Sequence, residues 1–256
     1  MAYDAVKRHL AIEKLVTRSS VKGLERRYYR FRLDRWYGGI VTADCVGCGL
    51  LCRFCWVSDR VAYNPSHVGS FYSPEDVALK LLHMADKSGL RQLRLSGGEP
   101  TIGKNHLLRL LELLDGSNLS FILETNGIPI AYDSDYVPQL SSYRFIHVRV
   151  SLKGCSENEF AMLTGAKPEN YRLQLTALER LIENDVSCHP SVMASFSTKE
   201  SLKALREKLA EISPILAENL EIEELILYPN VRRKIARYGL RYYTSYYPDN
   251  IPPEQI

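Results

Sequence analysis

The chain has 256 residues, of which 45% are hydrophobic and 25% are charged, as in an ordinary globular protein. No run of about 18 apolar residues occurs, so we expect no transmembrane helix and no membrane partner. The first ten residues also lack the apolar stretch of a signal peptide. Six cysteines do not make a disulfide scaffold in a chain of this size, and clustered cysteines in an intracellular protein more often bind metal. We therefore expect a cytoplasmic protein.

Charge is distributed unevenly along the chain, although the net charge is only +3. Residues 1–38 carry ten Lys or Arg and four Asp or Glu, residues 229–256 carry five and two, and the segment between them carries eighteen and twenty-four. Basic flanks on an acidic body could attract a polyanion. The alternative, which we favour, is that the flanks are solvated helix faces and a tail packed on the body.

The predicted elements alternate along the chain after an N-terminal helix. Residues 2–17 have the apolar spacing of that helix, and the Arg- and Tyr-rich residues 26–30 fit either a strand or irregular structure. Strands are predicted to begin near residues 40, 91, 119, 145, 190 and 222. Helices are predicted near residues 73–88, 104–114, 133–141, 156–163, 170–184 and 198–216. Only the sixth strand lacks a predicted helix after it.

Strands that alternate with helices indicate βαβ units with right-handed crossovers, and hence a parallel sheet. Six units are too few for a closed eight-stranded barrel, so we predict an α/β fold, either a partial (βα)6 barrel or an open sheet. We place it at residues 39–228, between a basic helical N-terminal extension (1–38) and a Tyr- and Arg-rich C-terminal tail (229–256). We expect the tail to pack its rings over the open edge of the sheet; the alternative is that they stack on nucleic acid.

Unusual residues follow four of the predicted strands, at the carboxyl ends where parallel α/β folds place their active sites. They are a cysteine loop, a glycine pair with a glutamate, a glutamate with an asparagine, and a serine with a lysine. In chain order these residues are Cys45, Cys48, Cys52 and Cys55; Gly97, Gly98 and Glu99; Glu124 and Asn126; and Ser151 and Lys153. The predicted fold and these motifs therefore indicate the same edge of the sheet.

The cysteine loop predicts a metal centre. Cys48, Cys52 and Cys55 have the spacing Cys-x3-Cys-x2-Cys, which can hold three irons of a [4Fe–4S] cluster and leave the fourth iron open. With Cys45, the four thiols could instead bind structural zinc. We favour the cluster, because the two Cys-x2-Cys pairs of a zinc ribbon are normally much further apart. Cys45 is then either a buried core residue or a thiol near the cluster.

The other residues predict what binds the open iron. Gly97 and Gly98 would let the backbone approach a ligand closely. Glu99 suits an ammonium group, and Lys153 suits a carboxylate. A ligand with both groups fits between the second and fourth strands, which points to the methionine end of S-adenosylmethionine.

At these motifs the chain resembles the radical S-adenosylmethionine (radical SAM) superfamily. Cys48-x3-Cys52-x-Phe54-Cys55 matches its CxxxCxΦC pattern, and Gly97-Gly98-Glu99-Pro100 matches its GGEP motif. The resemblance covers roughly residues 39–228. Thr125-Asn126-Gly127 and Leu152-Lys153 look most like the group that includes glycyl-radical-enzyme activases.

This resemblance implies the cofactors and the chemistry. A reduced cluster cleaves S-adenosylmethionine bound at its open iron, and the resulting 5′-deoxyadenosyl radical abstracts hydrogen from the substrate. By family position, Phe54 would lie near the adenine, and Glu124 and Asn126 near the ribose. Lys153 would contact the carboxylate, and Ser151 stands where the activases commonly have aspartate.

We therefore expect an activase-like enzyme that acts on a protein or peptide and receives electrons from an external donor of the flavodoxin or ferredoxin type. One alternative is a radical SAM enzyme that modifies tRNA or another RNA, which the basic flanks motivate. An alternative of another class is a non-enzymatic zinc-binding interaction module. Cys155 also lies at the predicted functional edge, as a core residue or a substrate-facing thiol.

Overall fold

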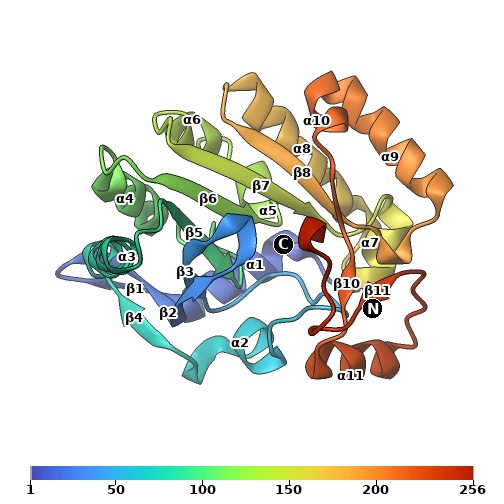
Figure 1. Ribbon diagram of the computed structural model, residues 1–256, viewed down its shortest axis with the longest axis horizontal. Helices are drawn as coiled ribbons and strands as arrows, with labels where there is room; N and C mark the ends of the chain where they lie inside the picture. The colour runs from blue at the N-terminus through green and yellow to red at the C-terminus, as the bar shows by residue number, and fades with distance from the viewer. Residues whose placement is uncertain (1, 256) are drawn as a thin grey trace.

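The computed structural model describes residues 2–255, and one sheet organises them (Figure 1). Six parallel strands lie side by side in chain order, so each βαβ unit adds its strand next to the previous one. They are β3 (Ile40–Cys45), β5 (Gln92–Gly97), β6 (Ser120–Thr125), β7 (Ile146–Leu152), β8 (Cys188–Met193) and β9 (Glu221–Glu223). The predicted α/β fold with a partial (βα)6 barrel is confirmed.

Helices follow the strands and cover one face of the sheet (Figure 1). Ser73 caps the first of them through a reciprocal hydrogen-bond pair with Asp76. The predicted helix at 198–216 is two helices, because Pro214 cannot continue the first. The helices are α3 (Pro74–Ser88), α4 (Lys104–Leu114), α5 (Ile128–Tyr132), α6 (Tyr136–Leu140), α7 (Glu157–Thr164), α8 (Tyr171–Glu183), α9 (Lys199–Ile212) and α10 (Pro214–Glu218). The predicted helix at 133–141 is the short α6, and a further short helix that was not predicted, α5, precedes it.

The two faces of the sheet differ in chemistry because side chains alternate along each strand. The face toward the helices is apolar: Ala43, Leu95, Leu123 and Val150 are fully buried there in the main core. The opposite face, which we call the inner face, carries charged side chains that form ion pairs between strands. This polar inner face is the side on which the strand ends and the cysteine loop meet.

The N-terminal segment is part of the sheet, which differs from the helical extension that we expected. It forms α1 (Ala5–Val16) and then two strands, β1 (Thr17–Ser20) and β2 (Gly23–Asp34). β2 pairs antiparallel with β3 and with the short β4 (Ser70–Tyr72). An irregularity between Tyr28 and Arg30 shifts the register, so no single alternating pattern runs through the strand.

The C-terminal segment also departs from the expectation. The predicted sixth strand is broken into β9 and β10 (Leu225–Ile226), and a helix, α11 (Pro229–Tyr238), follows it. The chain then returns through β11 (Ser245–Tyr246), which pairs parallel with β10. The rings of Tyr238, Tyr242, Tyr243 and Tyr247 are exposed, whereas Tyr246 of β11 is half-buried, so packing of the rings over the sheet edge stays a prediction.

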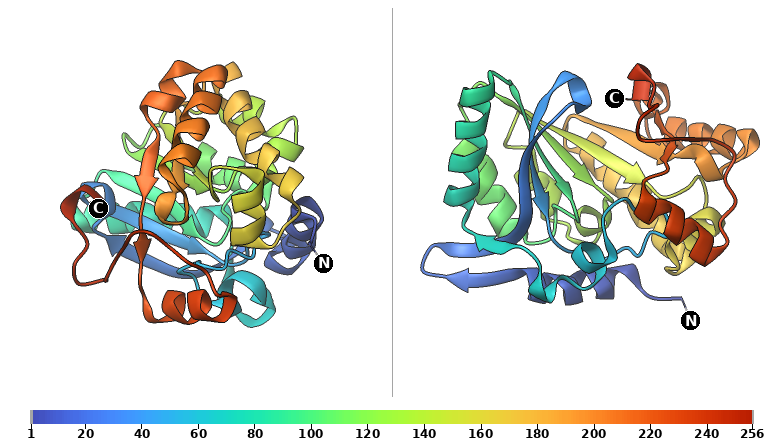
Figure 2. Two further views of the ribbon diagram at one scale, coloured as in Figure 1. Left: turned by 90° about the vertical axis from the view of Figure 1, so that its right-hand side faces the viewer. Right: turned by 60° about the horizontal axis from the view of Figure 1, so that its bottom comes forward.

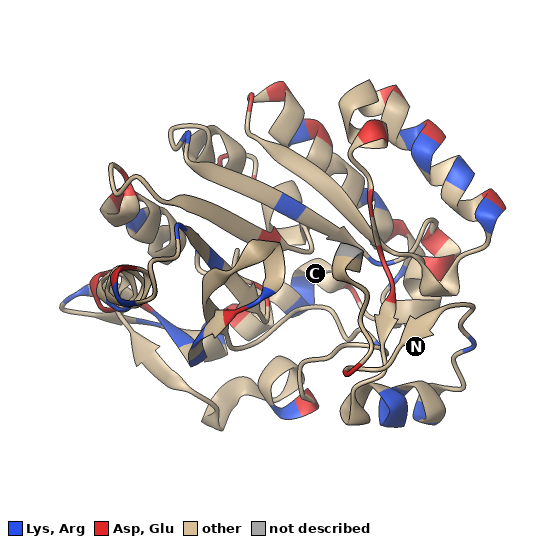
Figure 3. Cartoon of the chain, viewed as in Figure 1, with Lys and Arg blue, Asp and Glu red and all other residues tan. Residues whose placement is uncertain are grey.

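Short elements complete the fold, and the helices α1 and α11 both contact the loop that follows β3 (Figure 2). Lys and Arg recur along β2 and α11, whereas α9 carries both signs of charge (Figure 3). Within residues 2–255, no helix has the length and apolar character needed to cross a membrane. The short elements are η1 (Trp36–Gly38), α2 (Asp59–Tyr63), η2 (Pro65–His67), η3 (Pro168–Asn170), η4 (Ala194–Phe196) and η5 (Pro253–Gln255).

Candidate functional site

The cysteine loop separates its thiols into two environments. Cys45, at the end of β3, is 1% exposed and lies in the main core beside the Tyr28 hydroxyl. Cys48, Cys52 and Cys55 instead belong to a second apolar cluster on the other side of the loop. The structure therefore brings together the three cysteines of the predicted motif and leaves the fourth apart.

The electrostatics of the thiols follow this division. Burial raises the pKa of Cys48, and the neighbouring Glu99, Cys52 and Cys55 raise it further. Burial raises the pKa of Cys52 to about 12, while Lys153 lowers it. Burial also raises the pKa of Cys45 to about 12. At this thiol, however, the neighbouring charges are Arg26, which lowers the pKa, and Asp44, which raises it. Three thiols that disfavour each other's ionisation can share a multivalent cation centre, which would compensate the charge of their thiolates.

The glycine pair lets the cysteine loop lie directly against β5. The Gly98 amide donates to the Cys45 carbonyl at 2.8 Å, and the Glu99 amide donates to the Gly47 carbonyl at 2.8 Å. A Cβ atom at position 98 would lie 2.3 Å from the Gly47 oxygen, so only glycine fits. The close approach that we had expected for a ligand is, in the structure, an approach between two loops.

Glu99 is a buried carboxylate whose hydrogen-bond partners are all neutral. Its Oε1 accepts hydrogen bonds from the amide and hydroxyl of Thr101 and from the hydroxyl of Thr125, at 2.7–3.1 Å. Its Oε2 accepts one, from the Asn126 amide at 2.8 Å. Within residues 2–255 no Lys or Arg pairs with Glu99, which is 1% exposed. Because Oε2 has a free lone pair and the charge lacks a counterion, an ammonium ligand would fit here.

Lys153 and Ser151 lie together at the end of β7. The lysine Nζ donates to the Ser151 hydroxyl at 2.5 Å, and its charge acts on both Cys52 and Cys55. Lys153 therefore supplies the positive group on the side of the cysteine loop where a ligand carboxylate would balance it.

Two other predicted residues have protein partners. Glu124 lies on the inner face and accepts from Arg94, Tyr37 and Ser96 at 2.6–3.1 Å. Burial alone would raise the pKa of Glu124, but Arg94 and the other donors lower it overall. Phe54 is buried and packs on Phe196 with ring centroids 5.3 Å apart. The roles near ribose and adenine stay predictions for these residues.

Sequence reasoning missed two residues that the terminal helices bring to the cysteine loop (Figures 1 and 2). His9 of α1 is fully buried, and its imidazole, the Cys48 Sγ and a Glu99 oxygen all lie within 4.8 Å of one another. Lys234 of α11 donates to the carbonyls of Cys55 and Val57, at 3.0 and 2.8 Å. In each case the available signal was a polar residue on the apolar face of an amphipathic helix.

The donor set fits a [4Fe–4S] cluster with an amino-acid-like ligand. Cys52 is buried, Cys48 and Cys55 are half-buried beside it, and two lysines, Lys153 and Lys234, lower the pKa values of Cys52 and Cys55 that burial raises. Glu99 offers an uncompensated charge on the adjoining strand end. Thiolates are the usual ligands of such clusters, and Glu99 and Lys153 match the two charges of an amino acid.

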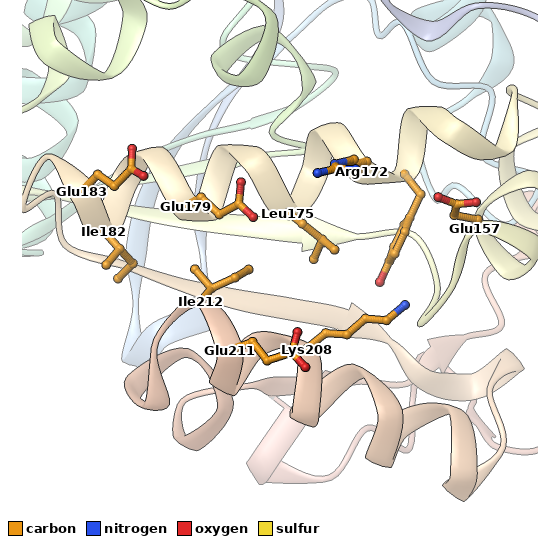
Figure 4. A pocket seen from close by; sticks show the side chains of 10 residues that line it. Glu157, Arg172, Leu175, Glu179, Ile182, Glu183, Lys208, Glu211 and Ile212 are labelled. Carbon is orange, nitrogen blue, oxygen red and sulfur yellow. The ribbon is translucent and has the colours of Figure 1, made fainter.

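A surface groove lies away from this site, between α8 and α9 on the outer side of the sheet (Figure 4). Its volume is about 660 Å³, and Leu175, Ile182 and Ile212 form part of its lining together with several glutamates. None of the predicted site residues lines it. The candidate chemistry is therefore at the strand ends and not in this groove.

Comparison with known proteins identifies the fold and relatives of the chain. GTP 3′,8-cyclase from Arabidopsis thaliana mitochondria is 25% identical over 203 residues, which cover 74% of this chain and 50% of the relative. A putative glycyl-radical enzyme activating enzyme from Methanocaldococcus jannaschii is 27% identical over 124 residues, 48% of this chain and 43% of the relative. The chain thus spans about half the length of the curated relatives it matches.

Solved structures share the fold at low sequence identity. SuiB of Streptococcus suis, bound to its precursor peptide SuiA, superposes with a TM-score of 0.57 at 17% identity, covering 78% of this chain and 46% of SuiB. The radical SAM superfamily model matches residues 44–209, more than half of the chain, including the three clustered cysteines and Glu99. This chain belongs to the radical SAM superfamily of enzymes, which use a [4Fe–4S] cluster and S-adenosylmethionine.

Proposed function

We propose that this radical SAM enzyme acts on a protein or peptide, in the manner of an activase. The observation that carries the proposal is the charge of the inner face, which a substrate must approach to reach the strand ends. The relatives by themselves do not decide the substrate class, because one is named as a GTP cyclase and another as an activating enzyme.

The ion pairs of the inner face join four arginines to five carboxylates, so this network has a net charge of −1. Arg94 pairs with Asp34 and Glu124, and Arg149 pairs with Glu221 and Glu223. Arg30 and Arg32 both pair with Asp44. A nucleoside triphosphate needs cations that are free to bind it, and these arginines are already neutralised. A neutral or basic peptide segment does not need free cations in order to bind to this face.

At the site itself, Cys48, Cys52 and Cys55 would hold the cluster, and Glu99 and Lys153 would hold the amino and carboxylate groups of S-adenosylmethionine. When bound, these cofactors supply one-electron cleavage of S-adenosylmethionine and hydrogen abstraction from the substrate. Glu99 Oε2 would accept from the ammonium, the half-buried Lys153 would donate to the carboxylate, and the buried surroundings of Glu99 would exclude water. We propose that electrons come from an external donor of the flavodoxin or ferredoxin type.

A deuterium-transfer experiment tests the substrate class. The reduced, cluster-loaded enzyme is incubated with S-adenosylmethionine and with protein, RNA or small-molecule fractions from cells of the source organism grown in deuterated medium. Hydrogen abstraction then transfers deuterium to 5′-deoxyadenosine, which mass spectrometry detects. We expect the protein fraction to transfer deuterium to 5′-deoxyadenosine. We expect this transfer to stop when a protease has digested that fraction to single amino acids. Label from the small-molecule fraction alone would contradict the proposal.

RNA modification is a second candidate, because an exposed aromatic and basic surface lies next to the cysteine loop. Tyr238, Tyr242 and Tyr243 are exposed on and after α11, among exposed arginines, and Lys234 ties this helix to the loop. Such a surface can stack bases and neutralise phosphates. In the same experiment, this candidate requires label from the RNA fraction that ribonuclease digestion abolishes, together with RNA binding that weakens as salt rises.

A further inference from the structure

His9 is held in one orientation and one tautomer by the helix that carries it. Its Nδ1 lies 2.8 Å from the Ala5 carbonyl, an acceptor, so Nδ1 must carry the proton. Its Nε2 lies 3.2 Å from the side-chain nitrogen of Asn126, which can only donate, so Nε2 is the acceptor. Gly49 of the cysteine loop packs against the ring, where a Cβ would lie 2.1 Å from Nδ1. The acceptor at Nε2 is therefore fixed in place.

Asn126 is oriented by three partners at once. Its Oδ1 accepts from the Ile128 amide at 3.0 Å, which directs its Nδ2 the other way. Nδ2 then lies 3.2 Å from His9 Nε2 and 3.6 Å from Cys48 Sγ. A side-chain amide has two N–H protons, so one can be donated to His9 and the other to the sulfur. His9 thus acts on Cys48 through Asn126.

We propose that the Asn126 side chain, positioned by His9, donates a hydrogen bond to the Cys48 thiolate and raises the reduction potential of the cluster. Asn126 is the donor, and His9 is a positioning residue. The inference rests on the proposed function, because it requires Cys48 to be a cluster ligand. It deepens that function by giving α1 a role in tuning the electron acceptor.

The direction of the effect follows from the charge. Reduction adds an electron to the cluster, and an N–H dipole pointed at a ligand sulfur stabilises the added negative charge. Cys48 Sγ also accepts from the Leu50 amide at 3.4 Å, a bond in which neither His9 nor Asn126 takes part. Removing the Asn126 bond therefore leaves one donor, and the cluster becomes harder to reduce.

The test is the midpoint potential of the cluster in the reconstituted protein, measured by redox titration followed by electron paramagnetic resonance, without S-adenosylmethionine. Asn126→Ala and His9→Leu should lower the equilibrium constant for reduction by roughly three- to tenfold, where tenfold corresponds to about 59 mV for one electron. His9→Gln, which keeps an acceptor for Asn126, should stay within about twofold of the wild type.

Ile12→Ala is the matched control. Ile12 lies on the same buried face of α1 and packs on Gly47 of the cysteine loop, but it has no part in the hydrogen bonds. We expect it to leave the potential unchanged. An Ile12→Ala shift as large as that of His9→Leu would overturn the proposal, since packing alone would then explain the effect. A wild-type potential in cluster-loaded Asn126→Ala would overturn it equally.

A measurement on the wild type covers the case in which a variant does not retain its cluster. With ¹⁵N-asparagine incorporated, pulsed electron paramagnetic resonance of the reduced cluster should show a ¹⁵N coupling, because Asn126 Nδ2 lies next to Cys48 Sγ. The absence of that coupling would overturn the proposal. If instead the wild-type protein binds zinc and no iron or sulfide, the proposed function itself fails.

Discussion

The carboxyl edge of the parallel strands and the two terminal helices build the same site in different ways. The edge supplies Cys48, Glu99 and Lys153, each a few residues beyond a strand and each within a short motif. The helices α1 and α11 supply His9 and Lys234, which contact partners 117 and 179 residues away in the chain. The edge offers groups that suit a cofactor, whereas the helices hold the loop on which those groups lie.

This difference separates two kinds of expected effect. A change at the edge should remove a cofactor contact and leave the fold intact. A change at a terminal segment should loosen its attachment and alter the site only through the cysteine loop.

Loss of an edge cysteine should have the largest effect. Cys52→Ala removes one of three ligands, so we expect at least a tenfold loss of bound iron after anaerobic reconstitution. Cys45→Ala is the control, because Cys45 lies in the main core beside Tyr28, and it should retain its iron. Iron and sulfide analysis of both variants decides this, and a fully loaded Cys52→Ala protein would refute the ligand assignment.

Acid should weaken the attachment of the N-terminal segment. His106 of α4 contacts the Tyr28 hydroxyl and the Leu24 carbonyl of β2, both at 2.9 Å, and burial lowers its pKa to about 4. The unfolded chain, with an ordinary histidine pKa near 6.5, binds this proton more readily. Stability is therefore lost as pH falls from about 6.5 to 4, by about 3 kcal/mol.

Denaturant unfolding of the metal-free protein between those pH values measures this effect. His106→Gln removes the titrating group, so the free energy of unfolding of the variant should change less with pH than that of the wild type. Other histidines contribute equally to both proteins and cancel in the difference. An identical pH dependence in the two would show that His106 does not link β2 to the sheet in this way.

Glu99→Gln should weaken the binding of S-adenosylmethionine and spare the cluster. A hydrogen bond to a charged group contributes about 1.5–3 kcal/mol, so the dissociation constant should rise by roughly 10- to 150-fold. Glu159→Gln is the control, since its carboxylate serves Cys155 and Ser197 and not Glu99. Equilibrium binding to the loaded proteins measures both, and an unchanged affinity in Glu99→Gln would place the ammonium contact elsewhere.

Lys234→Met should have the smallest effect, on stability. It removes a buried ammonium that binds two loop carbonyls and pairs with Asp59 at 2.7 Å, at a cost of about 1–2 kcal/mol. The neighbouring Arg233 is exposed, so Arg233→Met should change the free energy of unfolding by less than about 0.5 kcal/mol. Equal losses in the two variants would mean that α11 does not brace the loop.

The six parallel strands and the residues at their ends could be predicted because each is encoded locally. A short apolar run, a glycine pair and a cysteine spacing can each be recognised within about ten consecutive residues. β2 was ambiguous because its register shifts between Tyr28 and Arg30, which breaks the alternating pattern. The run from Ile222 to Tyr228 resembles one strand, although it divides into β9 and β10. α11 was missed because residues 229–256 were interpreted from their tyrosine and arginine content alone.

The contacts of the site were harder to predict than its location. Nothing near Glu124 in the sequence indicates Arg94, and nothing near Asn126 indicates His9, because these pairs form only when the sheet assembles. The predicted role of Gly98 was to let a ligand approach the backbone. Its missing side chain admits the cysteine loop, which no local pattern could show.

The most direct test of the whole account is a joint analysis of metal and turnover in one anaerobically purified sample. We expect about four irons and four sulfides per chain and, on reduction with S-adenosylmethionine present, formation of 5′-deoxyadenosine. The same sample of Cys52→Ala should show neither. Zinc without iron and sulfide in the wild-type protein would contradict the account.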